Sequence, residues 1–391
     1  MTVGGLAGGT TGGRGEDLPG ATVGDLDEDA RARVALSRLA EPGDAALGEE
    51  VARLGAAEVL GRVRDGTLGV RSTDGYRVRL DRLDVDADLT VAGRAGAGLV
   101  LPDRAGWPAQ LDDLGPARPL LLWVCGRDGL EAASGRSVAV VGARACTPYG
   151  EAVAGELAAG LGDRGWTVVS GGAFGVDAAA HRGALAVGGV TVAVLACGVD
   201  VAYPVAHTSL LAAVRGGGAV VTELPPGSHP TRTRFLERNR VIAALTRGTV
   251  VVEAAIRSGA RNTAGHADRL SRVVMAVPGP VTSASSAGCH RMVREEGAVL
   301  VTCASDVVDA VGAMGDDASV ELRGEERPHD GLDPVALRVL EALPIRRWAP
   351  PDAVGRTAGL DPPSVLRALG RLGAAGLATT KDGAWRRGHG R

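Results

Sequence analysis

Seven short apolar runs, rich in Val and Ala, alternate with longer segments between residues 137 and 302. The runs lie at 137–142, 167–171, 190–197, 218–223, 248–253, 273–277 and 298–302. Strands that are apolar on both faces are typical of parallel sheets, because helices cover both sides of such a sheet. Helices are expected in the intervals, as at 149–162 and 175–187. The alternation predicts βαβ units and therefore an α/β fold with a parallel sheet.

The segment before this alternation predicts a small helical unit. Residues 1–28 are rich in Gly, Thr and Asp, and are expected to be a disordered tail. Residues 29–62 have apolar side chains at helical spacing and predict two or three short helices, broken at Pro42-Gly43. Residues 63–100 give no clear prediction. The stretch 107–126 predicts a strand that leads into the main sheet.

The segment after the alternation predicts a separate C-terminal unit. Residues 314–332 are polar and charged, and are expected to form a linker. Three helical segments follow within 333–376, and then a hairpin that turns at Asp382-Gly383, with Trp385 on its return strand. Three helices followed by a hairpin predict a winged helix over residues 333–391.

Composition argues against several classes of protein. The formal net charge is −3, and the acidic excess lies in the first 115 residues. Lys381 is the single lysine, so arginine must make any contact to phosphate that needs a fixed cation elsewhere. The five cysteines are scattered and form no CxxC pair, which predicts neither a disulfide framework nor a metal site. The start of the chain has no pattern of a secretory signal, and no apolar run reaches about 20 residues, so a soluble cytoplasmic protein is expected.

Small and basic residues follow the first strand of the alternation. Gly142, Ala143 and Arg144 come directly after strand 137–142, and helix 149–162 begins shortly afterwards. Ligands of parallel sheets bind at the carboxyl ends of the strands, and the start of a helix favours an anion. This turn is therefore a candidate anion site. A tight turn with a solvated arginine is the alternative, and the absence of GxGxxG disfavours a dinucleotide site.

A second turn, rich in glycine, follows strand 167–171. It reads SGGAFG over residues 170–175, and its glycines permit positive φ and close approach of a backbone. A second anion nest beside the first is plausible here. Asp177 and His181 lie one helical turn apart and could relay a proton. Because no nucleophile accompanies them, the favoured interpretation is that Asp177 caps the helix and His181 is satisfied locally.

Residues 230–240, PTRTRFLERNR, hold four arginines within nine residues, and Phe235 lies among them. Arginine together with an aromatic ring suits single-stranded nucleic acid, because the cations contact the backbone and a base stacks on the ring. A solvated basic face is the alternative. An internal ion pair, for instance of Arg240 with Glu223 or Glu253, is a further competitor for part of the cluster.

No credible catalytic set is present. The chain has no Walker GxxxxGK[ST], no GxSxG and no HExxH. Glu253 ends a strand and could act as a base, but an acid beside arginine-rich turns is more often a structural partner.

Taken together, these segments resemble the DNA-processing protein A family (DprA, also called Smf). The ordered motifs are VAVVGAR with TPYG, VVSGGAFGVDAAAH, VLACGVDVAYP, ELPPG, FLERNR, VVEA with SG and TA, and AVPGP. The resemblance covers roughly residues 100–312. It implies an extended Rossmann-like domain over 101–313, a helical, SAM-like N-terminal domain over 29–100 and a C-terminal winged helix.

The resemblance also implies a function without catalysis and without a cofactor. Such proteins bind single-stranded DNA, protect incoming DNA in natural transformation, load the RecA recombinase and form homodimers through the Rossmann-like domain. The residues that would bind DNA here are Gly142, Ala143, Arg144, Ser170, Gly171, Gly172, Phe174, Arg232, Phe235, Arg238, Asn239 and Arg240. This chain has Ala143 where Ser is common, Gly172 where Leu is common and His207 where Asn is usual.

Two other functions remain open from the sequence. A nucleotide phosphoribohydrolase would use a related fold with Glu253 as its acid, but the PGGxGTxxE string of such enzymes is absent. A DNA-binding regulator would read duplex DNA with the helix in PPSVLRALGRL, which offers only Arg367 and Arg371.

Overall fold

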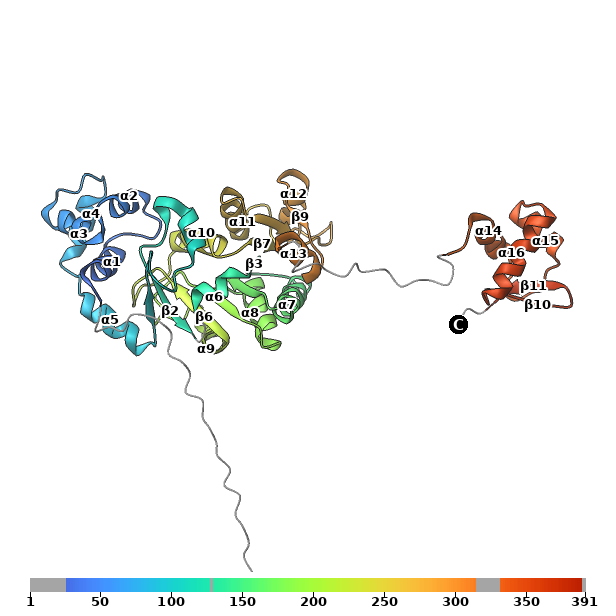
Figure 1. The fold of residues 1–391 in the computed structure, drawn as a ribbon, viewed down its shortest axis with the longest axis horizontal. Helices are drawn as coiled ribbons and strands as arrows, with labels where there is room; N and C mark the ends of the chain where they lie inside the picture. The colour runs from blue at the N-terminus through green and yellow to red at the C-terminus, as the bar shows by residue number, and fades with distance from the viewer. Residues whose placement is uncertain (1–25, 127–128, 314–330, 389–391) are drawn as a thin grey trace, which may run out of the picture. The chain divides into compact units, whose positions relative to one another are not determined.

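The computed structural model describes residues 26–126, 129–313 and 331–388 (Figure 1). The chain divides into two compact units, residues 1–319 and 320–391. Most of the predicted tail and of the predicted linker lies outside the described residues. Within the described part, helix α1 already begins at Glu28.

A nine-stranded sheet forms the centre of the first unit, and the fold class is α/β as predicted. The strand order is β1-β2-β6-β5-β4-β3-β7-β8-β9. All seven predicted strands are present and parallel to their neighbours among these seven: β3 (Ser137–Val141), β4 (Thr167–Ser170), β5 (Thr191–Val194), β6 (Gly218–Thr222), β7 (Gly248–Val251), β8 (Val273–Ala276) and β9 (Val299–Leu300). The strand order reverses at β3, which has β4 on one side and β7 on the other. Such a switch point opens a crevice at the carboxyl ends of the strands.

Helices cover both faces of this sheet, which explains why the strands are apolar throughout. On one face, α7 (Pro148–Asp163), α8 (Val176–Ala186) and α13 (Ala304–Val311) share a core with Val138, Val140 and Val250. On the other, α10 (Arg232–Ala244), α11 (Gly259–Arg269) and α12 (Ala287–Glu295) share a core with Ala139 and Val141. The helix α9 (Thr208–Gly217) packs near β2, β5 and β6.

Two antiparallel strands extend the sheet beyond β6. The strand β2 (Leu122–Gly126) pairs with β6, and β1 (Gly98–Val100) pairs with β2. The predicted lead-in strand is therefore confirmed, but it is preceded by a 3₁₀ segment, η1 (Ala109–Ala117). The short helix α6 (Leu130–Gly135) leads into β3.

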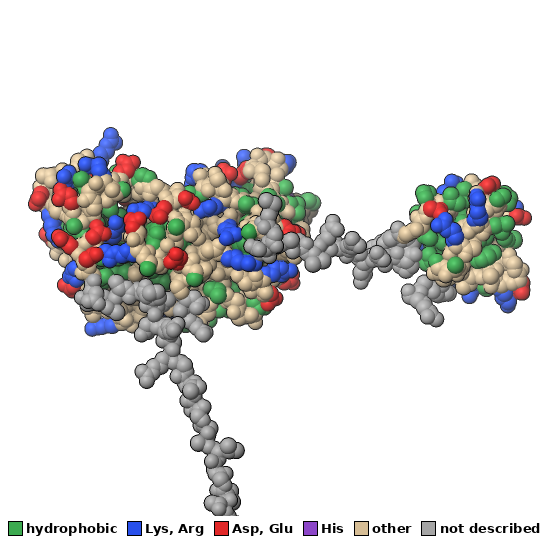
Figure 2. All heavy atoms as spheres, in the orientation of Figure 1, with side chains coloured by type: hydrophobic (Ala, Val, Ile, Leu, Met, Phe, Trp, Pro, Cys, Tyr) green, Lys and Arg blue, Asp and Glu red, His purple; other side chains and the backbone are tan. Residues whose placement is uncertain are grey.

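Within residues 26–97 of the described structure, five helices precede the sheet: α1 (Glu28–Leu39), α2 (Ala45–Leu54), α3 (Ala56–Asp65), α4 (Thr73–Leu80) and α5 (Val85–Arg94). The break at Pro42-Gly43 is confirmed, and Gly43 has a positive φ of 79°. These helices bury a core of their own around Leu36, Val59 and Tyr76. Acidic and basic side chains are interspersed over them in Figure 2.

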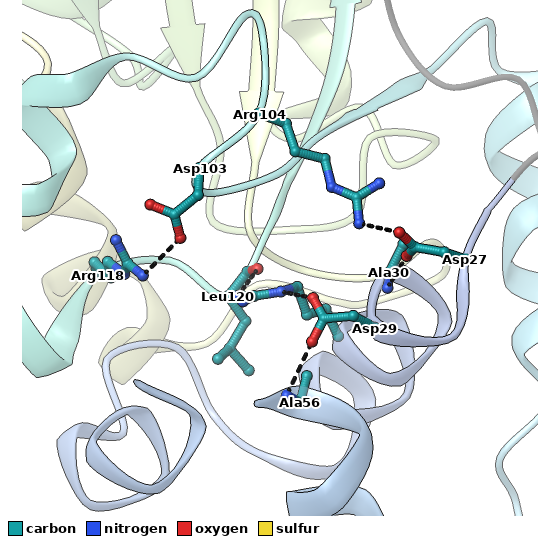
Figure 3. Close-up of polar contacts among 9 residues, drawn as sticks. Asp27, Asp29, Ala30, Ala56, Asp103, Arg104, Arg118 and Leu120 are labelled. Atoms are coloured by element: carbon teal, nitrogen blue, oxygen red, sulfur yellow. Dashed lines mark hydrogen bonds and ion pairs between the residues drawn. The ribbon is translucent and has the colours of Figure 1, made fainter. Parts of the chain in front are cut away.

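Polar contacts join these helices to one another and to the segment around β1 and β2 (Figure 3). The carboxylate of Asp29 accepts from the Ala56 amide at 3.0 Å, which ties α1 to α3. Arg33 donates to the Leu120 carbonyl at 3.2 Å, and Arg104 pairs with Asp27 at 2.5 Å. The helical segment is therefore docked on the sheet by hydrogen bonds and ion pairs as well as by apolar contacts.

The described residues of the second unit, 331–388, form three helices and a hairpin: α14 (Pro334–Ala342), α15 (Pro351–Ala358), α16 (Pro362–Ala374), β10 (Ala378–Lys381) and β11 (Ala384–Arg387). A core around Val339, Leu369 and Leu372 holds them together. The predicted helices and hairpin are confirmed as elements, and their assignment to the winged-helix fold stays a prediction.

Candidate functional site

A pocket of about 630 Å³ opens at the switch point of the sheet, beside the carboxyl ends of β3 and β7. Its walls come from the segments after five parallel strands, β3 to β7, and from the starts of α8, α10 and α11. The lining residues are Val141, Gly142, Arg144, Ala173, Asp177, Tyr203, Pro230, Thr231, Arg232, Phe235, Leu236, Arg238, Asn239, Ile242, Arg257, Ser258, Gly259, Ala260, Asn262 and Thr263. A pocket of this size can receive a group as large as a nucleotide.

One face of α10 forms a wall of the pocket. Thr231 caps this helix, because its side chain accepts from the Arg234 amide at 3.2 Å. Arg232, Phe235, Leu236 and Asn239 then line the pocket. Residues at this spacing lie on the same side of a helix. The start of α10 therefore presents a cation and a ring to the same space.

Three arginines form the rim of the pocket: Arg144 after β3, Arg232 on α10 and Arg257 after β7. All three are exposed, and the described part of the chain gives none of them a carboxylate partner. The first turns of α10 and α11 also line the pocket. Helix N-termini attract anions, so cations and backbone dipoles act in the same direction here.

An aromatic surface lies within this rim. The guanidinium of Arg144 lies over the Phe235 ring, 4.3 Å from its centroid, which is a cation–π contact. The rings of Phe235 and Tyr203 lie 5.7 Å apart and are tilted by 52°. Phe235 is only half-buried, and Tyr203 is exposed. The site therefore offers ring surface beside cations.

The floor of the pocket is built around the buried Arg238. Its guanidinium donates to the carbonyls of Gly171, at 2.7 Å, and Val194, at the ends of β4 and β5. Burial lowers the pKa of Arg238 to about 10, and the nearby Asp177 opposes this shift. Asp177 accepts from the Gly171 amide at 3.1 Å, and burial raises the pKa of its carboxyl. Arg238 is therefore charged at neutral pH, and its Nη1 group is held by the protein's own carbonyls.

Three further polar residues of the arginine-rich segment are also paired internally. Arg240 is buried and forms a two-pronged ion pair with Glu223, 2.7 Å between Nη2 and Oε2. Burial opposes the charge of Arg240, but Glu223 outweighs it and raises the pKa of the guanidinium. Asn239 donates to Asn262 of α11 at 3.0 Å. Arg234 pairs with Glu41, after α1, at 2.8 Å and 2.9 Å. Of the four arginines in PTRTRFLERNR, only Arg232 is free of such contacts in the described structure.

The two glycine-rich turns differ from each other. Gly142 and Arg144 line the pocket, whereas the Ala143 amide donates to the Glu253 carbonyl at 2.8 Å. In the second turn, Ser170 is buried and its hydroxyl donates to the Val140 carbonyl at 2.7 Å. A Cβ at Gly171 would collide with the Arg238 guanidinium. The close approach at Gly171 is therefore made by the protein's own arginine.

Gly172 and Phe174 lie outside the lining of the pocket. Gly172 has a positive φ of 67°, and its carbonyl accepts from His207 at 3.0 Å. The His207 ring also meets the Phe174 ring edge-on at 4.6 Å. His207 thus braces the second turn.

Glu253 holds the turn that follows β3. Its two carboxylate oxygens accept from the amide and the hydroxyl of Thr147, at 2.8 Å and 2.7 Å. It is 1% exposed and does not line the pocket. His181, the other candidate for proton transfer, is buried against Thr191, and burial lowers its pKa to about 3. Neither group is placed to act on a molecule in the pocket.

Sequence reasoning does not single out several pocket residues. Tyr203 lies within the quoted motif VLACGVDVAYP, and Arg257 stands directly before the SG of the motif after β7. Ser258, the serine of that SG motif, caps α11, and Asn262 lies in the first turn of this helix. The expected helix α7 is present, but the helix starts that line the pocket belong to α8, α10 and α11.

Among the described residues, no cluster of His, Cys, Asp or Glu could hold a metal ion. None of the described helices is both long and apolar enough to cross a membrane.

Comparisons with known proteins agree with this architecture. The family model for DNA recombination-mediator protein A matches residues 98–312. A Mycobacterium tuberculosis protein that carries the name DprA is 48% identical over 377 residues, which cover 92% of this chain and 95% of that protein. The DNA processing protein DprA of Streptococcus pneumoniae is 40% identical over 202 residues, covering 52% of this chain and 70% of that protein.

A solved structure extends the likeness to three dimensions. The X-ray structure of DNA processing protein A from Streptococcus pneumoniae superposes with a TM-score of 0.63 and 32% sequence identity. The match covers 74% of this chain and 99% of that one. With the family model matching more than half of the chain, this protein belongs to the DNA recombination-mediator protein A family.

Proposed function

We propose that this protein binds single-stranded DNA in the pocket at the switch point, without catalysing a reaction on it. The observation that carries the proposal is that Arg144, Arg232 and Arg257, all exposed and without a carboxylate partner in the described structure, line the same pocket as Phe235, with Arg144 over its ring. Cations that follow the backbone, combined with rings on which bases stack, are the usual means of holding a single strand. A duplex hides its bases from such rings.

Membership of the family supports the wider role. We propose that the bound strand is incoming DNA in natural transformation, that the protein acts as a homodimer in the cytoplasm and that it loads the RecA recombinase. These steps can be tested by sedimentation of the free protein, and by RecA filament formation on single-stranded DNA with and without this protein.

Two observations favour binding over catalysis. The carboxylate of Glu253 is buried against Thr147, and Nη1 of Arg238 donates to two backbone carbonyls, so neither group is poised for chemistry on a molecule in the pocket. Asp177, the carboxyl that does line the pocket, accepts from two backbone amides of the turn that precedes α8. Incubation with nucleoside monophosphates is expected to release no free base.

The binding test is fluorescence anisotropy of labelled oligo-dT and of a matching duplex at two salt concentrations. We expect tighter, salt-sensitive binding of the single strand. Arg144→Ala should weaken it and reduce the slope of log K against log salt by about 0.7 for each phosphate that the variant no longer neutralises. The matched control is Arg64→Ala, since Arg64 is an exposed arginine of α3 away from the pocket. Equal weakening in both variants, or a preference for duplex, would contradict the proposal.

A further inference from the structure

A small two-stranded sheet in the C-terminal unit carries the most informative unassigned surface. The hairpin β10–β11 is extended by Ala349, which exchanges backbone hydrogen bonds of 3.0 Å and 2.7 Å with Trp385. Residues directly opposite each other in an antiparallel pair lie on the same face, and successive residues alternate. The pairing therefore decides which side chains face the core of this unit and which face outward.

The inward face holds Ala349, Trp385 and Ala378, all of which belong to the core of the unit. The outward face must then hold their neighbours. Thr379 pairs with Arg386, Lys381 pairs with Ala384, and Trp348 precedes the bridged Ala349. The contact between Arg386 and Trp348, 4.6 Å from guanidinium to ring centroid, agrees with this assignment.

This outward face is basic and aromatic. Trp348 is 38% exposed, and Lys381 is the chain's single lysine. Arg346 and Arg347 precede the tryptophan and are exposed. Throughout the described residues, none of these cations has an acidic partner. Figure 2 shows basic side chains among hydrophobic ones on the visible side of this unit.

The helix α16, which would enter the major groove in a winged helix, offers fewer free cations than this face does. On α16, Arg371 pairs with Asp333 at 2.5 Å, and Arg367 donates to Ser364 at 3.3 Å. Leu366, which lies between these two residues, is exposed and apolar. Because groove reading needs free polar groups that reach base edges, α16 is poorly equipped for it. The favourable surface of the unit is the sheet.

We propose that the outward face of this sheet, defined by Trp348, Arg386, Thr379 and Lys381, is a second binding surface for single-stranded nucleic acid. An unpaired base stacks on the exposed part of the indole, and the cations around it contact the adjoining phosphates. This surface goes beyond the pocket function and does not depend on it, since it shares no residue with the pocket.

The test uses the full-length chain with the pocket disabled by Arg144→Ala and Arg232→Ala. Oligo-dT should still bind and should quench tryptophan fluorescence, because Trp348 is the tryptophan that a base can reach most directly. In that background Trp348→Ala should weaken the residual binding about fivefold or more. Trp348→Phe should retain most of the binding and lose the quenching. The pocket proposal fails in a different way: it would be contradicted if the double variant Arg144→Ala and Arg232→Ala bound oligo-dT as tightly as the wild type does.

A matched pair of charge variants tests the face itself. Arg386 and Arg387 are adjacent in β11 and lie on opposite faces of it, so each substitution by Ala removes one charge. Arg386→Ala should weaken the residual binding and lower the salt slope by about 0.7, while Arg387→Ala should do neither. Equal effects of the two variants, equal affinity for duplex, or unchanged binding by Trp348→Ala would overturn the proposal. Circular dichroism of each variant separates loss of binding from loss of folding.

Discussion

The rim and the floor of the pocket use the same residue type for opposite purposes. At the rim, Arg232 is exposed at the first position of α10 and has no acidic partner among the described residues. On the floor, Arg238 and Arg240 of the same helix are 7% and 3% exposed; Arg238 donates to two strand-end carbonyls, and Arg240 is paired with Glu223. A charge that is free to meet phosphate is available for binding, whereas a buried and paired one holds the fold.

This difference matters for how the motif FLERNR is interpreted. Its two arginines suit DNA by composition alone, yet the structure uses both to fix α10 against the ends of β4, β5 and β6. Gly171 of the second turn likewise has a structural role, because a side chain at this position would collide with the Arg238 guanidinium. The floor therefore keeps the rim in position, and the two regions should respond differently to mutation.

The largest effect is expected for Arg240→Ala. This change leaves the carboxylate of Glu223, 10% exposed, without its partner. Breaking a buried ion pair by removing one member costs about 3–5 kcal/mol of folding free energy. Urea unfolding followed by circular dichroism measures it. A variant that is as stable as the wild type but binds DNA weakly would place Arg240 at the rim instead.

Phe235→Leu should have the next largest effect, and on DNA affinity. The ring lies under Arg144 and beside Tyr203, and stacking of one base on such a ring is worth about 1–3 kcal/mol. The salt dependence should stay unchanged, because no charge is removed. Anisotropy titrations of oligo-dT at two salt concentrations check both statements.

The control for that variant is Phe174→Leu. Phe174 is the other phenylalanine of the chain, is 49% exposed and packs on His207 outside the pocket lining. Its replacement should change oligo-dT affinity less than Phe235→Leu does. The reverse order would mean that bases stack on the second turn.

Arg232→Ala should change the salt dependence of binding and leave stability in place. When one phosphate of a single strand is no longer neutralised, the slope of log K against log salt falls by about 0.7. An exposed side chain without a partner contributes little to folding, so the free energy of unfolding should stay within about 0.5 kcal/mol of wild type. An unchanged slope would show that Arg232 does not meet a phosphate.

Much of this organisation can be predicted from the sequence, because hydrophobic periodicity reports burial directly. The seven strands, the helices between them and the C-terminal hairpin are at the predicted positions. Residues 63–100 are harder to predict. The helix α4 is short and mostly exposed, and acidic residues interrupt the apolar pattern of α5. The candidate site is expected at the carboxyl ends of the strands, and the pocket opens there.

The division of the arginines cannot be predicted in the same way. Periodicity shows that a side chain faces inward, but not which distant carboxylate or carbonyl it meets. The pair of Arg240 with Glu223 is one of the alternatives that the sequence leaves open, and the structure confirms it. The contacts of Arg238 with strand-end carbonyls, and the place of Tyr203 and Arg257 in the pocket, depend on turns that meet only in three dimensions.

The smallest effect is expected for Arg234→Ala, which is the sharpest test of the division because Arg234 lies two residues from Arg232. Its guanidinium is held by Glu41, whose side chain is 52% exposed, so the pair is accessible to solvent. Exposed ion pairs contribute about 0–1 kcal/mol, and the stability should fall by no more than that.

DNA affinity and its salt slope should stay at the wild-type values in Arg234→Ala, since this arginine does not line the pocket. Glu41→Gln gives the complementary measurement, because it removes the carboxylate and leaves the cation. If Arg234 contacts DNA only when it is released, Glu41→Gln would strengthen binding and raise the slope. If Arg234→Ala weakened DNA binding as much as Arg232→Ala does, the DNA-binding surface would extend from the rim toward the N-terminal helices. An ion pair with an acidic residue would then not distinguish the structural arginines of α10 from those that bind DNA.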